Sequence, residues 1–123
     1  MHQTIPAKAI AEKVVQQMKQ AAEGGDPSSL FKADSVVIVP EKGSIKGIEG
    51  IKAHFQEKKS KLSDKLKMEV KLEDAIDAGD YVIARIHCTP SADGKELASG
   101  AGLVVITRDG KIHWQCFSLE KSS

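Results

Sequence analysis

The sequence predicts an α+β fold, in which helices from the first half of the chain cover a sheet built mainly from the second half. Two observations support this prediction. Helical periodicity dominates the first half, whereas apolar and polar residues alternate with a period of two from Lys65 onward. The length of 123 residues and the hydrophobic content of 41% are those of a single domain, 1–123, with its own core.

Residues 6–23 are expected to form the first helix. Ile10, Val14 and Met18 recur every four residues, which places them on one face. The glycine pair at 24–25 supplies a stop. The amphipathic pattern predicts that this helix packs on the sheet with its apolar side.

Shorter elements follow. The Asp-Pro pair at 26–27 suits an N-cap and a first helical position, and predicts a short helix carrying residues 30–31. A β-branched run at 35–40 is a strand, and 41–47 is a turn with a brief return strand. Residues 48–62 then form a second long helix with one apolar side.

Four strands complete the chain. The first alternates strictly between apolar and charged residues and ends at the turn 78–80. Glycine-containing turns separate the others. These three strands span residues 81–89, 97–107 and 111–119.

The composition argues against several classes of partner. The net charge is +1, only Arg85 and Arg108 are arginines, and aromatic residues make up 4% of the chain, which disfavours nucleic-acid binding. No apolar run approaches the ~20 residues of a membrane span, and we expect no membrane partner. Cys88 and Cys116 lack metal-ligand spacing, so we expect no metal, no cofactor and a reducing, cytoplasmic setting.

The last three strands are apolar on both faces, and two helices can cover only one of them. A large apolar patch left in water usually marks an interface. We therefore expect a homodimer through the outer sheet face, with Trp114 near its centre. The residues expected at this interface are Arg85, His87, Val104, Ile106, Trp114 and Cys116.

Four segments in order, 30–37, 47–55, 79–85 and 108–112, resemble the nuclear transport factor 2-like superfamily. The chain is most similar to its SnoaL-like and ketosteroid isomerase-like branch. The resemblance implies a cone: a curved antiparallel sheet wrapped around N-terminal helices, usually dimeric, with a pocket on the concave side. Because this superfamily hosts isomerases, cyclases, hydrolases and transport adaptors, the fold does not determine the function.

The steroid isomerase branch implies three catalytic positions: a tyrosine on the first helix, an aspartate before the proline that ends the first strand, and a second acid on the penultimate strand. Matched to this chain, they fall on Met18, Val39 and Leu103. None of these side chains can take a proton or stabilise an oxyanion. Steroid isomerase chemistry is therefore not expected.

If Leu103 faces inward, the same matching turns His113, Gln115 and Phe117 inward. His113 could act as a general base or donate to a ligand, or be a half-exposed histidine near the hairpin turn. Gln115 could orient a ligand carbonyl, or satisfy a neighbouring backbone group or a water. Asp74 interrupts the apolar side of its strand, as an acid at the pocket mouth or at a bulge that returns it to water. The expected pocket residues are Met18, Val39, Phe55, Ala84, Ile86, Leu103, His113, Gln115 and Phe117.

Three functions are compatible with these features. The first is a homodimeric module that binds a small apolar molecule in the cone, since such pockets are mostly hydrophobic. The second is a SnoaL-like enzyme of isomerase, cyclase or hydrolase type, with Asp74, His113 and Gln115 as an atypical polar set. The third is a protein-interaction domain without ligand, whose interior is filled by side chains.

Overall fold

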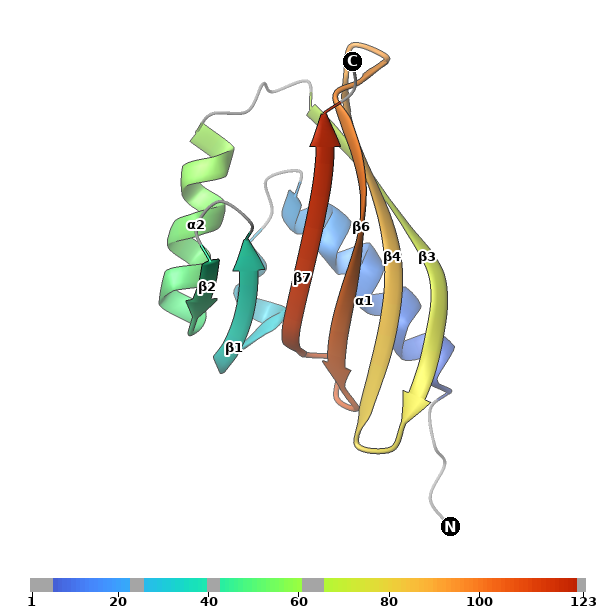
Figure 1. The fold of residues 1–123 in the computed structure, drawn as a ribbon. Coiled ribbons are helices and arrows are strands. Elements are labelled where there is room, and N and C mark those ends of the chain that lie inside the picture. The colour runs from blue at the N-terminus through green and yellow to red at the C-terminus, as the bar shows by residue number, and fades with distance from the viewer. Residues whose placement is uncertain (1–5, 23–25, 40–42, 61–65, 122–123) are drawn as a thin grey trace.

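The computed structural model describes residues 6–22, 26–39, 43–60 and 66–121, and confirms the α+β fold class (Figure 1). Two helices lie on one side of a curved, unclosed sheet. The elements are α1 (Ala7–Ala22), the 3-10 helix η1 (Pro27–Ser29), β1 (Phe31–Val39), β2 (Gly43–Lys46), α2 (Ile48–Ser60), β3 (Leu66–Ala78), β4 (Tyr81–Ala92), β5 (Lys95–Glu96), β6 (Ala98–Thr107) and β7 (Ile112–Lys121).

Helix α1 follows the predicted amphipathic pattern. Its buried stripe consists of Ile10, Ala11, Val14, Val15, Met18 and Ala21. This stripe packs against β3, β4 and β6, whereas α2 packs against β1, β2 and η1. The predicted stop at 24–25 lies outside the described residues. Within those residues, neither helix has the length and apolar character that crossing a bilayer requires.

The Asp-Pro start of the short helix is confirmed. Asp26 is the N-cap, and its side chain accepts a hydrogen bond of 2.9 Å from the Ser28 N–H. The predicted extent of this helix was wrong, because η1 ends at Ser29, Leu30 is its C-cap and Phe31 begins β1. Leu30 and Phe31 are buried, so the strand forms earlier than its β-branched residues indicate.

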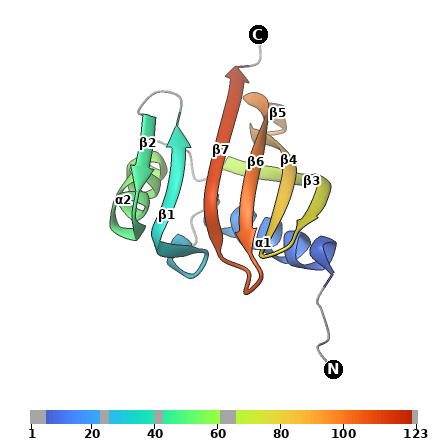
Figure 2. The ribbon, with the colours of Figure 1, turned by 60° about the horizontal axis from the view of Figure 1, so that its bottom comes forward.

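The sheet has the strand order β2-β1-β7-β6-β4-β3, with β5 paired to β4 (Figure 2). All pairs are antiparallel except β1–β7, which is parallel. The expectation of a wholly antiparallel sheet was therefore wrong at one junction. This junction joins the N-terminal third of the chain to its last strand.

A buried serine holds that junction. The Ser35 hydroxyl accepts a hydrogen bond of 2.7 Å from the Lys32 N–H and donates one of 2.5 Å to the Ile112 carbonyl. The Ser35 carbonyl accepts from the Gly47 N–H at 2.8 Å, and the Ile112 N–H donates to the Leu30 carbonyl at 2.6 Å. Ser35 has no exposed surface, so these bonds close a register shift in the β1–β7 ladder without water.

Two bulges decide which side chains face the helices. In β3 the register shifts between Leu72 and Asp74, and at the β6–β7 turn it shifts between Val105 and Ile106. The extra residue of the second bulge lies in β7, so Ile112 and Gln115 both face the helices. Strand β6 alternates regularly and buries Val104 and Ile106 on the concave face, with Ala84 and Val82 as their β4 partners. Their expected place on the outer face was wrong by one residue.

The β6–β7 pair contains a close approach. A Cβ built on Gly102 would lie 2.3 Å from Cδ1 of Phe117 and 2.8 Å from the Cys116 carbonyl oxygen. Gly102 is the direct partner of Phe117 across the two strands. The absence of a side chain at 102 therefore lets the Phe117 ring lie flat over the sheet.

One arginine connects the two turns at the same end of the sheet. Arg108 Nε donates to the Gly79 carbonyl at 2.8 Å, and its guanidinium pairs with the Asp77 carboxylate. This hydrogen bond and one from the Gly79 N–H lower the pKa of Asp77 below its ordinary value. The turn after β3 and the turn after β6 are thereby held together.

We expect Ser35→Ala to lower the free energy of unfolding by about 2 kcal/mol, because it leaves the Lys32 N–H and the Ile112 carbonyl short of a buried partner. Denaturant titration measures the loss. Ser118→Ala, at an exposed position of β7, is the matched control and should cost less than about 0.5 kcal/mol. Equal effects of the two substitutions would contradict the assigned role of Ser35.

Gly102→Ala should destabilise the fold by about 1–3 kcal/mol, because the new methyl group displaces the Phe117 ring. In a Phe117→Leu background the same substitution should cost less, since the ring that it meets is gone. A double-mutant cycle should therefore give a coupling of about 1 kcal/mol or more. Additive costs would show that the contact does not limit residue 102.

Candidate functional site

Gln115 lies on the concave face at the centre of the sheet. It pairs with Val37 of β1 on one side and with Val104 of β6 on the other, and both valines are buried. Directly opposite residues share a face, so all three point toward the helices. Gln115 is 4% exposed, and Ser35 is the other buried polar residue.

The Gln115 amide differs from the Ser35 hydroxyl in one respect. The Ser35 hydroxyl is fully hydrogen-bonded, whereas Oε1 of Gln115 is buried without a hydrogen-bond partner. Leaving such an acceptor unpaired costs on the order of 1–3 kcal/mol. Gln115 faces the helices, as predicted. Its side-chain oxygen accepts no hydrogen bond from a neighbouring backbone group.

Two half-buried aromatic side chains, Phe55 and Phe117, lie on the concave side of the sheet. Phe117 follows Gln115 on the same side of β7, and Phe55 of α2 lies 6.0 Å from Phe31, measured between ring centroids. Phe55 and Phe117 are only half-buried, although both pack on the core. Helix α1 packs mainly against β3, β4 and β6, and helix α2 packs mainly against β1 and β2. β7 therefore lies between the two covered parts of the sheet.

The three positions matched to steroid isomerase chemistry carry no catalytic group. Met18 and Val39, for which the sequence predicts a place in the pocket wall, are buried in the core. Leu103 does not face inward: it is 46% exposed on the convex face, and this prediction was wrong. Its neighbours Gly102 and Val104 take the concave positions. A shift of one residue therefore supplies no acid either.

His113 lies on the convex side, which contradicts its expected place in the pocket. The register shift makes it the extra residue between Ile112 and Trp114. Its ring lies 5.2 Å from that of Tyr81, which is 37% exposed, and its Nδ1 is buried without a partner. Nothing in the sequence near 113 signals a bulge, so strict alternation gave the wrong face.

Asp74 is exposed at the β3 bulge. This confirms the expectation of a bulge that returns its carboxylate to water, and not that of an acid at a pocket mouth. It pairs with Arg85 across the ladder, and its Oδ1 accepts from the Ala75 N–H at 2.9 Å. Three strand spacings of about 4.8 Å each separate β3 from β7. The ladder also aligns Asp74 with Cys116, so His113 is displaced along β7 as well. The two residues do not form a catalytic pair.

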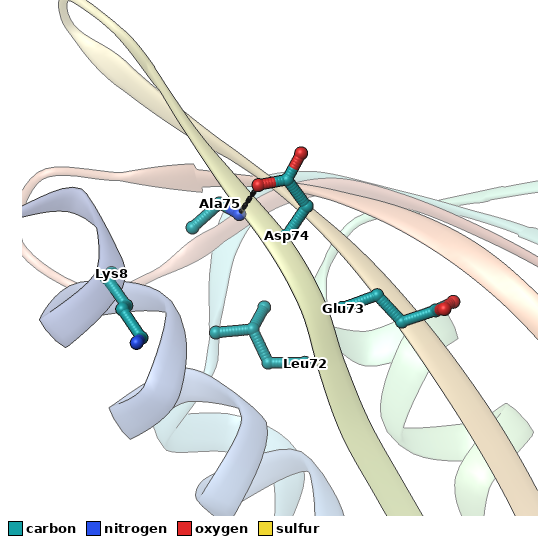
Figure 3. Close-up of a pocket in the computed structure, with 5 residues that line it drawn as sticks. All are labelled: Lys8, Leu72, Glu73, Asp74 and Ala75. Atoms are coloured by element: carbon teal, nitrogen blue, oxygen red, sulfur yellow. Dashed lines mark hydrogen bonds between the residues drawn. The ribbon is translucent and has the colours of Figure 1, made fainter.

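A hollow of about 280 Å³ lies beside this bulge, lined by Lys8, Leu72, Glu73, Asp74 and Ala75. Figure 3 shows Lys8 of α1 on the same side of β3 as Leu72, while the Asp74 carboxylate points to the other side. Its charged groups thus diverge, and the hollow is separate from Gln115. No sequence feature points to this hollow. Asp74, an acid at a position where the alternation predicts an apolar residue, marks the bulge beside it.

The convex face is apolar over several strands. Ile76, Tyr81 and Leu103 are exposed by 52%, 37% and 46%. Val105 and Trp114, which are direct partners, are half-buried beside them. Of the residues expected at an interface, Arg85, His87, Trp114 and Cys116 lie on this face. Val104 and Ile106 do not.

The remaining pocket residues expected from the sequence, Ala84 and Ile86, are fully buried on the concave face. Cys88 follows them there, and burial raises the pKa of its thiol to about 11, whereas Cys116 is on the convex face. Both cysteines are free. Within the described residues, no three His, Cys, Asp or Glu side chains gather in a way that could hold a metal ion.

Several solved structures share this fold at low sequence identity. A cystatin-like protein of unknown function from Nostoc punctiforme matches with a TM-score of 0.80 at 16% identity, over 99% of this chain and 97% of that one. The yeast UBP3-associated protein BRE5 gives 0.78 at 13%, over 96% and 99%. A ketosteroid isomerase-like protein from Erwinia carotovora atroseptica gives 0.68 at 13%, over 94% and 95%.

No curated protein matches the sequence. The model of the SnoaL-like domain family matches residues 15–114, which extend from α1 to the middle of β7. This segment includes both bulges and the Ser35–Ile112 junction, and it ends one residue before Gln115. The chain therefore belongs to the SnoaL-like domain family.

Proposed function

We propose that this chain is a homodimeric binding module, which holds a small, mainly apolar molecule against the concave face of β7. The observation that carries the proposal is the buried, unpaired Oε1 of Gln115. A ligand hydroxyl or amine N–H would satisfy this acceptor. Free cysteines on opposite faces of the sheet suit the reducing cytoplasm as its location.

The surroundings of Gln115 define the ligand class. Val37 and Val104 flank the amide, and the rings of Phe55 and Phe117 lie on the same side of the sheet. A site with apolar walls and one polar group orients a ligand by a single hydrogen bond. We therefore expect a molecule with an apolar body and one hydrogen-bond donor.

The alternatives have weaker support. An isomerase needs a base, and Met18, Val39 and a neutral glutamine amide cannot serve as one. A ligand-free interaction domain has no need for an unpaired amide in its interior. BRE5 is described as associated with UBP3, but at 13% identity it shares the fold alone.

The convex face supports the homodimer. Leu103, Ile76 and Tyr81 are exposed there around the half-buried Val105–Trp114 pair. Exposed apolar surface of this extent typically marks an interface. A second copy presents the same apolar face, so the two surfaces match in polarity.

To test the ligand class, we would measure the binding of 2-naphthol, which donates one hydrogen bond, and of 2-methoxynaphthalene, which donates none. The wild-type chain should bind 2-naphthol about tenfold more tightly, the worth of one buried hydrogen bond. Gln115→Leu should abolish this preference. Gln56→Leu, at an exposed position of α2, is the matched control and should keep it. A preference that persists in Gln115→Leu would contradict the proposal.

The interface is tested with Leu103→Glu, which places a charge at the centre of the convex face. Sedimentation equilibrium at micromolar concentration should show that the mass of the assembly falls by half. Leu97→Glu is the matched control, because Leu97 is 45% exposed but lies between β5 and β6, beyond the last pair of the β4–β6 ladder. A wild-type monomer, or an unchanged mass for Leu103→Glu, would refute this interface.

A further inference from the structure

Strand β3 is an edge of the sheet. It ends the strand order and pairs with β4 on one side, and none of the described residues pairs with its other side. With 13 residues it is the longest strand of the sheet. An edge of this length presents a row of free N–H and C=O groups that another strand can use.

The charges along this edge alternate. Lys67, Glu69, Lys71 and Glu73 are exposed, and they succeed one another at every second residue. Between them Met68, Val70 and Leu72 pack against the core, but each is only half-buried. The edge therefore combines a solvated charged face with an apolar face that is only half-buried, although α1 packs against it.

We propose that β3 pairs antiparallel with β3 of a second copy, centred on Val70. This interface differs from the convex-face interface and from the ligand site. A chain that uses both interfaces forms a tetramer, in which two of the proposed homodimers join through their β3 edges. In this register Lys67 lies opposite Glu73, and Glu69 lies opposite Lys71. By two-fold symmetry each of these two oppositely charged pairs occurs twice.

The charge pattern disfavours every register centred on a charged residue of this segment. Among the apolar centres, only Val70 pairs all four charges of 67–73 with opposite charges. Centring the pair on Glu69 or on Lys71 places identical charges opposite each other, because each centre then faces itself. Directly opposed like charges destabilise a strand pair, whereas opposite charges stabilise it. Centring on Val70 also brings Met68 opposite Leu72 on the concave face, where both gain cover.

The bulge limits the length of the contact. After Leu72 the ladder with β4 shifts, and Lys8 of α1 lies beside the strand at this point (Figure 3). The pairing therefore extends over 67–73, where the charges are self-complementary. Lysines and bulges on an edge usually prevent unspecific pairing. In β3 the alternating lysines and glutamates disfavour pairing with strands of other charge patterns. The same charges are complementary to those of β3 in a second copy.

The test uses two charge variants of the full chain. Lys67→Glu with Lys71→Glu makes the edge wholly acidic, and Glu69→Lys with Glu73→Lys makes it wholly basic. Each variant alone should weaken edge pairing by about tenfold or more, and sedimentation equilibrium should show half of the wild-type mass. An equimolar mixture should regain the wild-type mass, because every opposed pair then has opposite charges.

Lys13→Glu with Lys19→Glu is the matched control, since both lysines are exposed on α1 and the net charge changes equally. Its mass should equal that of the wild type. Leu103→Glu separates the two interfaces: this protein should still dimerise through the edge, and adding the acidic edge should give monomers. A monomeric Leu103→Glu chain, an unaffected edge variant or a mixture that fails to regain mass would each overturn the proposal.

Discussion

The structure depends on how the first strand joins the last. At the β1–β7 junction the chain must change register, and the Ser35 hydroxyl fills the gap by accepting from Lys32 and donating to Ile112. These two hydrogen bonds fix the register of β1 relative to β7. This register places Val37 opposite Gln115 on the concave face. A hydroxyl that is worth little on the surface thus determines which side chains reach the centre of the molecule.

The two faces of the sheet have different chemistry. On the concave face, apolar side chains surround one amide whose oxygen has no partner. On the convex face, exposed Leu103 and half-buried Trp114 lie beside polar groups such as Arg85. A binding role fits a face with a single unpaired acceptor, while association fits the other. Both assignments rest on side chains, because the fold alone is shared by proteins of many functions.

Much of the fold could be predicted from the sequence, because period and turn chemistry are local. The apolar repeat of α1 and the alternation in β3 gave these elements within a few residues. The concave or convex placement of individual residues could not be predicted equally well. Each bulge inserts one residue and inverts every later assignment on its strand. The odd position of Asp74 signalled one bulge, whereas His113 gave no sign of the other. Leu103, Val104 and Ile106 were assigned to the wrong faces for a different reason, because β6 alternates regularly and the family position was matched one residue away from a concave residue.

The parallel junction also has a consequence for biosynthesis. Ser35 and Ile112 are 77 residues apart, so the strand that is made first cannot complete its pairing until the last strand has left the ribosome. Loop closure over such a distance slows folding, since its entropic cost precedes any gain from contacts. During this interval the edge of β1 that pairs with β7 has no partner strand, and Val37 lacks its neighbour Gln115. The nascent chain is therefore most exposed to aggregation and to chaperones before β7 is synthesised.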